Sequence, residues 1–157
     1  MFRPLPVDRR VVRPAYVWLA IVAEVFTALG AIPVGVMLLS DTSGGAVGLK
    51  SAWIEATPFG SYLLPGLYLL FVNGAGMLLL AALSIARHRF APWLTAILGS
   101  GLVIWIGVQL VVLPEVSFLQ AMFGVIGLLL VTIGVAWLRR TGLLGRPVAV
   151  GDAPAVR

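Results

Sequence analysis

Residues 15–40 read AYVWLAIVAEVFTALGAIPVGVMLLS, an apolar run in which Glu24 is the only charged side chain. An α-helix rises about 1.5 Å per residue, so about 20 apolar residues cross the hydrocarbon core of a bilayer. This run is longer than that and predicts a transmembrane helix. Pro33 lies in its second half, where it removes one backbone donor and predicts a kink. A cleaved signal peptide is the alternative, with Ala28-Leu29-Gly30 as the cleavage site, but the run continues well beyond Gly30.

The composition supports the membrane interpretation. Of the 157 residues, 61% are hydrophobic and only 11% are charged, against about 45–50% and about 25% in soluble domains. One soluble core of this size does not bury so much apolar surface, so lipid must cover much of it. The chain has no cysteine, which excludes disulfides, thiol catalysis and cysteine metal sites.

Three further apolar runs, 62–86, 91–113 and 116–138, contain no charged residue. The links 87–89 and 114–115 are so short that consecutive runs must be antiparallel neighbours, whereas residues 41–61 form a longer loop. We therefore predict an all-α polytopic membrane protein with four transmembrane helices in an up-down bundle. A basic, proline-containing arm (1–14) precedes this domain (15–138), and a flexible tail (139–157) follows it.

The basic residues predict the orientation of the chain. Ten of the eleven lie in segments 1–14, 87–89 and 139–157, and Lys50 alone lies in the 41–61 loop. By the positive-inside rule both termini are cytoplasmic. The formal charge of +5 does not indicate nucleic-acid binding, because the basic residues cluster at the ends of apolar runs. We expect Arg87 and Arg89 to contact anionic lipid headgroups at about 1 kcal/mol each.

Small residues recur on single helical faces of the first and fourth runs. Such stripes let helix backbones approach closely in lipid, and we expect helix contacts along them. The stripe on the first run contains Glu24 with Ala20, Ala28, Ala31 and Gly35, and the stripe on the fourth contains Gln120, Gly124, Gly127, Val131 and Gly134. Ala96, Ser100 and Gly107 form a partial stripe on the third run.

Glu24 lies slightly to the cytoplasmic side of the middle of its span. Counting from the turns places Asn73, Ser100 and Thr132 within about one helical turn of its depth. A carboxylate at this depth costs about 3 kcal/mol, so we predict a protonated Glu24 that donates to Asn73, Ser100 or a backbone carbonyl. This acid either holds helices together or serves proton coupling, ion coupling or ligand anchoring.

Three other intramembrane features carry predictions. Gln109 and Gln120 lie equally far from the turn at 114–115, and we predict a hydrogen bond between them of about 0.6 kcal/mol. Asn73 precedes Gly74-Ala75-Gly76, which either admits a neighbouring backbone or loosens the helix. Trp105 is deeper than an interfacial aromatic should be, and it either fills a gap beside glycines or lines a lipid groove.

The chain offers few groups for catalysis. Glu24 has no second intramembrane carboxylate beside it, and His88, the one histidine, lies between two arginines without other metal ligands near it in sequence. Phosphate-loop, dinucleotide and haem-ligand patterns are absent. We expect no enzyme, no cofactor and no bound metal.

The chain resembles small uncharacterised four-span proteins of GC-rich, actinobacterial-type bacteria. The resemblance rests on arginine-only clusters, Gly/Ala-rich spans and the region from DTSGG at 41–45 to TPFGSYLLPGLYLL at 57–70, and it implies a bacterial inner-membrane protein without an assigned activity.

Three functions are open. The first is an accessory or partner-binding subunit of a lipid-transport or respiratory assembly, with an integral-membrane partner or a second copy. The second is a small oligomeric transporter or proton-coupled carrier using Glu24 and Asn73. The third is a protein that binds a lipid or apolar ligand under the 41–61 loop.

Overall fold

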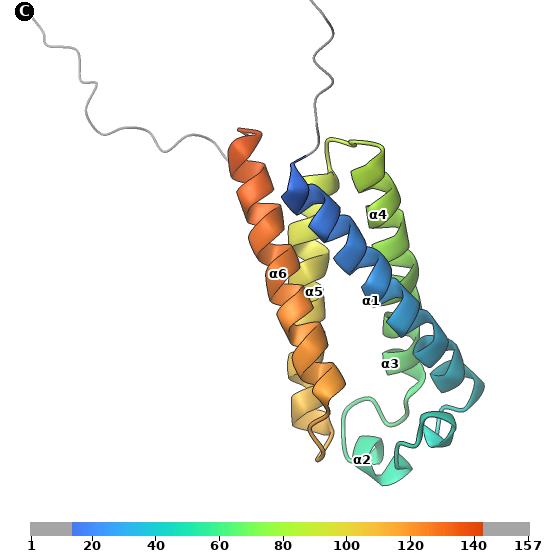
Figure 1. Ribbon diagram of the computed structural model, residues 1–157. Coiled ribbons are helices and arrows are strands. Elements are labelled where there is room, and N and C mark those ends of the chain that lie inside the picture. Colours follow the sequence, from blue (N-terminus) through green and yellow to red (C-terminus); the bar gives the residue numbers. More distant parts are fainter. Residues whose placement is uncertain (1–13, 143–157) are drawn as a thin grey trace, which may run out of the picture.

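The computed structural model describes residues 14–142, and these residues contain helices and turns but no strand. Four helices are long and apolar enough to cross a membrane (Figure 1). They are α1 (Ala15–Ser40), the continuous span Leu63–Ile85, α5 (Ala91–Val112) and α6 (Phe118–Arg140). The all-helical class and the four long apolar helices are confirmed. Most of the predicted arm and tail, residues 1–13 and 143–157, lies outside the described residues.

The second span is built from three segments with different windings. It begins as α3 (Leu63–Leu67), widens into the π-helix η2 (Tyr68–Gly76) and ends as α4 (Met77–Ile85). A Cβ added to Gly74 would lie 2.7 Å from Ile32 Cγ1 on α1. The Asn73–Gly76 segment therefore combines both predicted features, because the helix is loosened there and a neighbouring helix also packs closely against it.

The loop between the first two spans contains two short helices, η1 (Gly45–Val47) and α2 (Ser51–Glu55). Asp41 begins the loop and accepts hydrogen bonds from Ser43 and from the backbone N–H of Ala46, the latter at 2.9 Å. At the other end of the loop the Tyr62 hydroxyl donates to the carbonyl of Lys50 at 3.1 Å. The loop is therefore attached at both ends to the helices that it joins.

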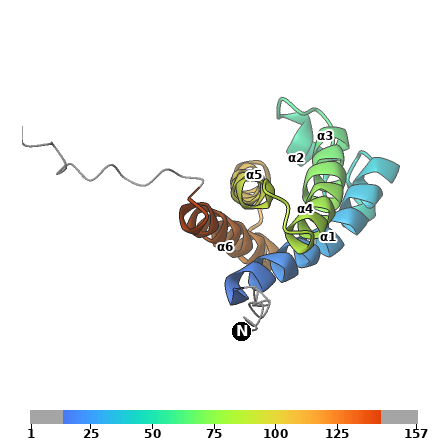
Figure 2. The same ribbon diagram turned by 90° about the horizontal axis from the view of Figure 1, so that it is seen from above.

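The four spans associate as two pairs, which lie side by side in Figures 1 and 2. In one pair α5 packs along α6, and a Cβ added to Gly134 would lie 2.5 Å from the backbone nitrogen of Ala96. In the other, α1 packs along the second span, and a Cβ added to Gly35 would lie 2.8 Å from the backbone nitrogen of Leu70. Contacts between the second span and α5 are much less extensive than those within each pair.

The expected stripe on the third run is partly wrong. Ser100 is exposed, and a Cβ added to Gly107 would meet nothing within 4 Å. Gly99 makes the close contact instead, because a Cβ there would lie 2.8 Å from Leu130 Cβ. The helix rotation that brings Ala96 and Gly99 against α6 leaves Ser100 and Gly107 outside the contact.

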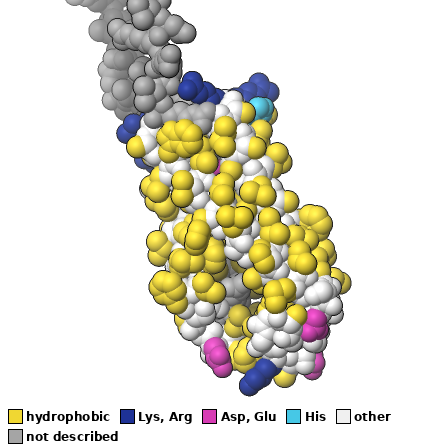
Figure 3. All heavy atoms as spheres, turned by 45° about the vertical axis from the view of Figure 1, so that its right-hand side comes forward, with side chains coloured by type: hydrophobic (Ala, Val, Ile, Leu, Met, Phe, Trp, Pro, Cys, Tyr) yellow, Lys and Arg dark blue, Asp and Glu magenta, His cyan; other side chains and the backbone are white. Residues whose placement is uncertain are grey.

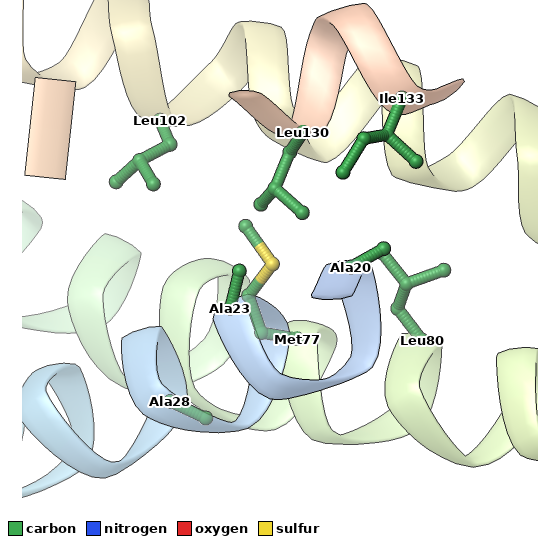
Figure 4. Packing of buried hydrophobic residues seen from close by; sticks show 8 residues of the cluster. All are labelled: Ala20, Ala23, Ala28, Met77, Leu80, Leu102, Leu130 and Ile133. Atoms are coloured by element: carbon green, nitrogen blue, oxygen red, sulfur yellow. The ribbon is translucent and has the colours of Figure 1, made fainter. Parts of the chain in front are cut away.

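The main apolar core joins the two pairs in the half of the bundle near the arginines. Met77, fully buried, lies at its centre in Figure 4, between residues of α1 and residues of α5 and α6. The other members are Ala20, Ala23, Ala28, Leu80, Leu102, Leu130 and Ile133. In the other half the described residues form a smaller buried cluster of Leu38, Ile54 and Tyr62, against which Val112 of α5 packs. A cavity also lies in this half.

The charged side chains gather at the two ends of the molecule, separated by an apolar belt (Figure 3). We call the end with Arg87, Arg89, Arg139 and Arg140 the arginine end, and the end with the 41–61 loop and the turn between α5 and α6 the loop end. Exposed apolar side chains from every span cover the surface between them, for example Val22, Phe71, Ile104 and Val125. This distribution is the one that a bilayer-spanning protein requires.

Candidate ligand cavity

A cavity of about 390 Å³ lies between the two helix pairs in the half of the bundle near the loop end. We call it the inter-pair cavity. Figure 3 shows a hollow between the two lobes of the molecule at this end. All four spans and the loop contribute to its lining, which includes Thr27, Ala31, Val34, Leu49, Trp53, Leu69, Asn73, Leu102, Trp105, Gln109, Gln120 and Phe123.

Two aromatic contacts border this cavity at mid-span. On one side Tyr68 stacks on Trp105 with ring centroids 4.7 Å apart, and its hydroxyl donates to the Gly101 carbonyl at 3.0 Å. On the other side the Phe123 ring lies against α1, and a Cβ added to Gly30 would lie 2.9 Å from it. Gly30 therefore allows α6 to approach α1 at this point.

The inner part of the cavity lining contains polar atoms without partners. Asn73 is 1% exposed, and neither its Nδ2 nor its Oδ1 has a hydrogen-bond partner. The indole Nε1 of Trp105 is also buried and unpartnered. Each such atom costs about 1–3 kcal/mol, and native proteins leave few of them. Asn73 also lies in the π-helix η2, a winding that is frequent at functional sites.

The rest of the lining is mostly apolar, with Thr27, Gln109, Ser117 and Gln120 as its uncharged polar residues. Glu115, at the exposed loop end, is the single charged residue among the described residues that line the cavity. A smaller chamber of about 80 Å³ lies beneath α2, and Leu49, Leu69 and Trp105 line both spaces. The two spaces are therefore adjacent, with these side chains between them.

Glu24 occupies a separate polar site nearer the arginine end. Its side chain is fully buried, and Thr95 Oγ1 on α5 lies 3.2 Å from its Oε1. The Ser84 hydroxyl also faces this carboxyl group, although neither Ser84 Oγ nor Glu24 Oε2 has a hydrogen bond of acceptable geometry. Glu24 is not part of the cavity lining.

The polar partners expected for Glu24 are not the ones that the structure provides. Asn73 lines the cavity without a partner, while the exposed hydroxyls of Ser100 and Thr132 donate to the carbonyls of Ala96 and Leu128 in their own helices. Thr95 and Ser84 were not predicted from the sequence, although their depths near that of Glu24 were an available signal. The hydroxyl of a threonine or serine in a membrane helix usually donates to a carbonyl of its own helix. The sequence therefore gives no sign of an additional contact with another helix.

The predicted Gln109–Gln120 hydrogen bond is also replaced by another contact. Gln120 Oε1 accepts from the backbone N–H of Ser117 at 2.8 Å, and Ser117 Oγ accepts from the N–H of Leu119 at 3.0 Å. This capping box begins α6. It uses the Gln120 side chain, which the predicted bond to Gln109 required. Gln109 is half-buried and lines the cavity.

The remaining candidate residues are placed as follows. Ala20, Ala28, Ala31 and Gly35 are buried on α1, Gly127 and Gly134 are buried on α6, and Gly124 is half-buried. Arg87 and Arg89 are exposed at the arginine end. Among residues 14–142 no group of His, Asp or Glu side chains is arranged to hold a metal ion.

No protein-family model, curated protein or solved structure matches the chain.

Proposed function

We propose that this chain binds one lipid or other apolar ligand in the inter-pair cavity. The observation that carries the proposal is a largely apolar cavity of about 390 Å³ that contains the unpartnered amide of Asn73. Ligand pockets of about 300–1,000 Å³, mostly apolar with a few placed polar groups, are typical of small-molecule sites. The proposal places the protein in the bacterial inner membrane with both termini in the cytoplasm, so that the cavity lies in the outer leaflet.

The position of the cavity supports a ligand that arrives from the bilayer. The apolar core around Met77 fills the half near the arginine end, whereas the loop-end half is held by the Tyr68–Trp105 stack and the Phe123–Gly30 contact. An acyl or prenyl chain in this half covers its apolar lining and keeps water at the loop end away from it. Burial of apolar surface is favourable by about 25 cal/mol per Å². Trp53 and Leu49 from the loop lie over the same space.

The other two functions stay hypotheses. The carrier hypothesis joins Glu24 to Asn73, but the two side chains occupy separate sites, since only Asn73 lines the cavity. The accessory-subunit hypothesis needs a face reserved for a partner, whereas exposed apolar side chains occur on all four spans among the described residues. Lipid contact alone accounts for that distribution.

Photolabelling in lipid nanodiscs tests the proposal. The probe is the methyl ester of a 16-carbon fatty acid with a photoreactive diazirine on its chain, and the labelled peptides are mapped by mass spectrometry. We expect labelling of cavity residues, such as Leu69 and Trp105, that an excess of unlabelled ester abolishes. Labelling confined to lipid-facing residues and insensitive to competitor would refute ligand binding.

A matched pair of variants on α1 locates the site. Val34 lines the cavity, whereas Val36 is 50% exposed and lies outside it. Val34→Trp should reduce the competable labelling at least fivefold by filling the space, and Val36→Trp should leave it unchanged. Equal effects of both variants would place the labelled site elsewhere.

A further inference from the structure

We infer that the inter-pair cavity selects uncharged ligands whose polar group is a hydrogen-bond acceptor, above all a carbonyl oxygen. The inference rests on the proposed function and specifies the chemical class of its ligand. Ketones, quinones, esters and amides with long apolar chains belong to this class, whereas ionised fatty acids and phospholipid headgroups do not. Asn73 and Trp105 are the residues that recognise the carbonyl group.

The unpartnered atoms define what the ligand must offer. Asn73 Nδ2 carries two N–H donors and Trp105 Nε1 carries one, while Asn73 Oδ1 is the one acceptor among these atoms. Among these three unpartnered atoms, N–H donors therefore outnumber acceptor oxygens. A carbonyl oxygen has two lone pairs and satisfies such donors without bringing a donor of its own.

The charges around the cavity argue for a neutral ligand. The described lining has no Lys, Arg or His, so a buried carboxylate or phosphate would have no counter-ion. Burial of an unpaired ion costs several kcal/mol. At the exposed end Glu115 is offset by Lys50, whose Nζ lies 5.4 Å from the ring centroid of the lining residue Trp53, so it is at the inner end that an anion is disfavoured. A cation would meet no carboxylate at the depth of Asn73, because Glu24 is not part of the lining.

The surroundings of the two residues differ in rigidity. Trp105 is fixed by its stack with Tyr68, whose hydroxyl is bound to the Gly101 carbonyl. The Asn73 amide is held by no hydrogen bond, and rotation about its terminal torsion, which has broad minima, turns either end toward the cavity that the side chain lines. Asn73 thus provides the adjustable donor, whereas the buried Trp105 Nε1 belongs to a ring that is fixed in place.

Competition among three ligands of equal chain length tests the inference in the photolabelling assay. The competitors are methyl palmitate, hexadecane and hexadecyl sulfonate, which carry a neutral carbonyl, no polar group and a permanent anion. We expect the ester to compete about tenfold better than the alkane, as one or two buried hydrogen bonds allow, and the sulfonate to compete least. Equal competition by ester and alkane would overturn the inference and leave the proposed function intact. Absence of any competable labelling would instead overturn the proposed function.

Two variants test whether Asn73 recognises the ester carbonyl group. Asn73→Leu should remove the preference for the ester while hexadecane still competes, which shows that the cavity is intact. Thr132→Leu, an exposed substitution on α6, should keep the preference. A preference that survives Asn73→Leu would overturn the role of Asn73.

A spectroscopic measurement on the unmodified protein covers the case in which Asn73→Leu fails to fold. The carbonyl stretch of ¹³C-labelled methyl palmitate should shift to lower frequency on binding, as a hydrogen-bonded ester does. A bound ester with the frequency of the free ester in alkane would overturn the inference.

Discussion

Thr95 Oγ1 lies 3.2 Å from Glu24 Oε1 and 2.9 Å from the Ala91 carbonyl oxygen, so one hydroxyl joins α5 to the acid on α1. A hydroxyl has one hydrogen and donates to one acceptor at a time. Both contacts are satisfied when Glu24 carries a proton, donates to Thr95 and leaves Thr95 to donate to Ala91. The two distances therefore fit a neutral Glu24 that donates to Thr95, with Thr95 donating to the Ala91 carbonyl.

We predict that Glu24 is protonated at pH 7. Full burial without a cationic partner among the described residues makes the ionised form costly. The infrared difference spectrum between the wild-type protein and Glu24→Gln should contain the carbonyl stretch of a protonated carboxylic acid. A difference spectrum that shows carboxylate bands instead would contradict the prediction.

Thr95→Val should lower the free energy of unfolding by about 0.6 to 1 kcal/mol. The change removes the interhelical contact with Glu24 and keeps the shape of the side chain. Thr132→Val is the matched control, because Thr132 is exposed and bonds only the Leu128 carbonyl of its own helix. Unfolding of both variants in mixed micelles of a mild detergent and dodecyl sulfate measures the difference. Equal stabilities of the two variants would show that the Thr95–Glu24 contact contributes nothing.

Glu24→Gln should preserve both stability and ligand labelling. An amide replaces the neutral acid as donor and acceptor, and Glu24 does not line the inter-pair cavity. The stability should therefore change by less than about 1 kcal/mol, and the competition by methyl palmitate should be unchanged. Loss of competition in a folded Glu24→Gln protein would indicate coupling between the two polar sites and favour the carrier hypothesis.

The sequence predicted the spans because their signal is simple. Length, absence of charge and short links determine four helices, and the observed bounds of α1, Ala15–Ser40, equal the predicted ones. The small-residue stripe on α6 could be read because Gly127 and Gly134 pack where a periodic face places them. The pairing of spans is harder to predict, since lipid contact and helix contact both accept apolar side chains.

The polar sites were predictable only by depth. Counting residues placed Glu24 and Asn73 near the same level, but depth says nothing about rotation around the bundle axis. The π-helix from Tyr68 to Gly76 changes the rotation of every later residue in its span, and α-helical periodicity does not register such a change. The cavity arises from the arrangement of whole helix pairs, which no local pattern encodes.

Close contact between α5 and α6 should make Gly134 intolerant of any side chain. In Gly134→Ala the added Cβ would lie 2.5 Å from the Ala96 nitrogen and 2.8 Å from its Cα, so the helices must separate. We expect a loss of about 1–3 kcal/mol, the usual cost of overpacking, measured by the same unfolding assay. Gly107→Ala on α5 is the control, because its Cβ would meet nothing within 4 Å and alanine favours helix. A Gly134→Ala protein as stable as Gly107→Ala would rule out this contact.

The 41–61 loop should loosen in acid because Asp41 must be ionised to hold it. The Ser43 hydroxyl and backbone N–H, with the Ala46 N–H, keep the pKa of Asp41 below its usual range. Because the pKa of Asp41 is lower in the folded state, its stabilisation of the loop is complete above the pKa of the unfolded state, about 3.9. This stabilisation is lost as the pH falls through the pKa of the folded state. The amide resonance of Ala46 should therefore be constant at neutral pH and move below about pH 4. In Asp41→Asn this titration should be absent, since an amide side chain does not ionise in this pH range, whereas Glu115→Gln at the same end should retain it. A midpoint above the ordinary aspartate value, or a titration that persists in Asp41→Asn, would show that another group controls the loop.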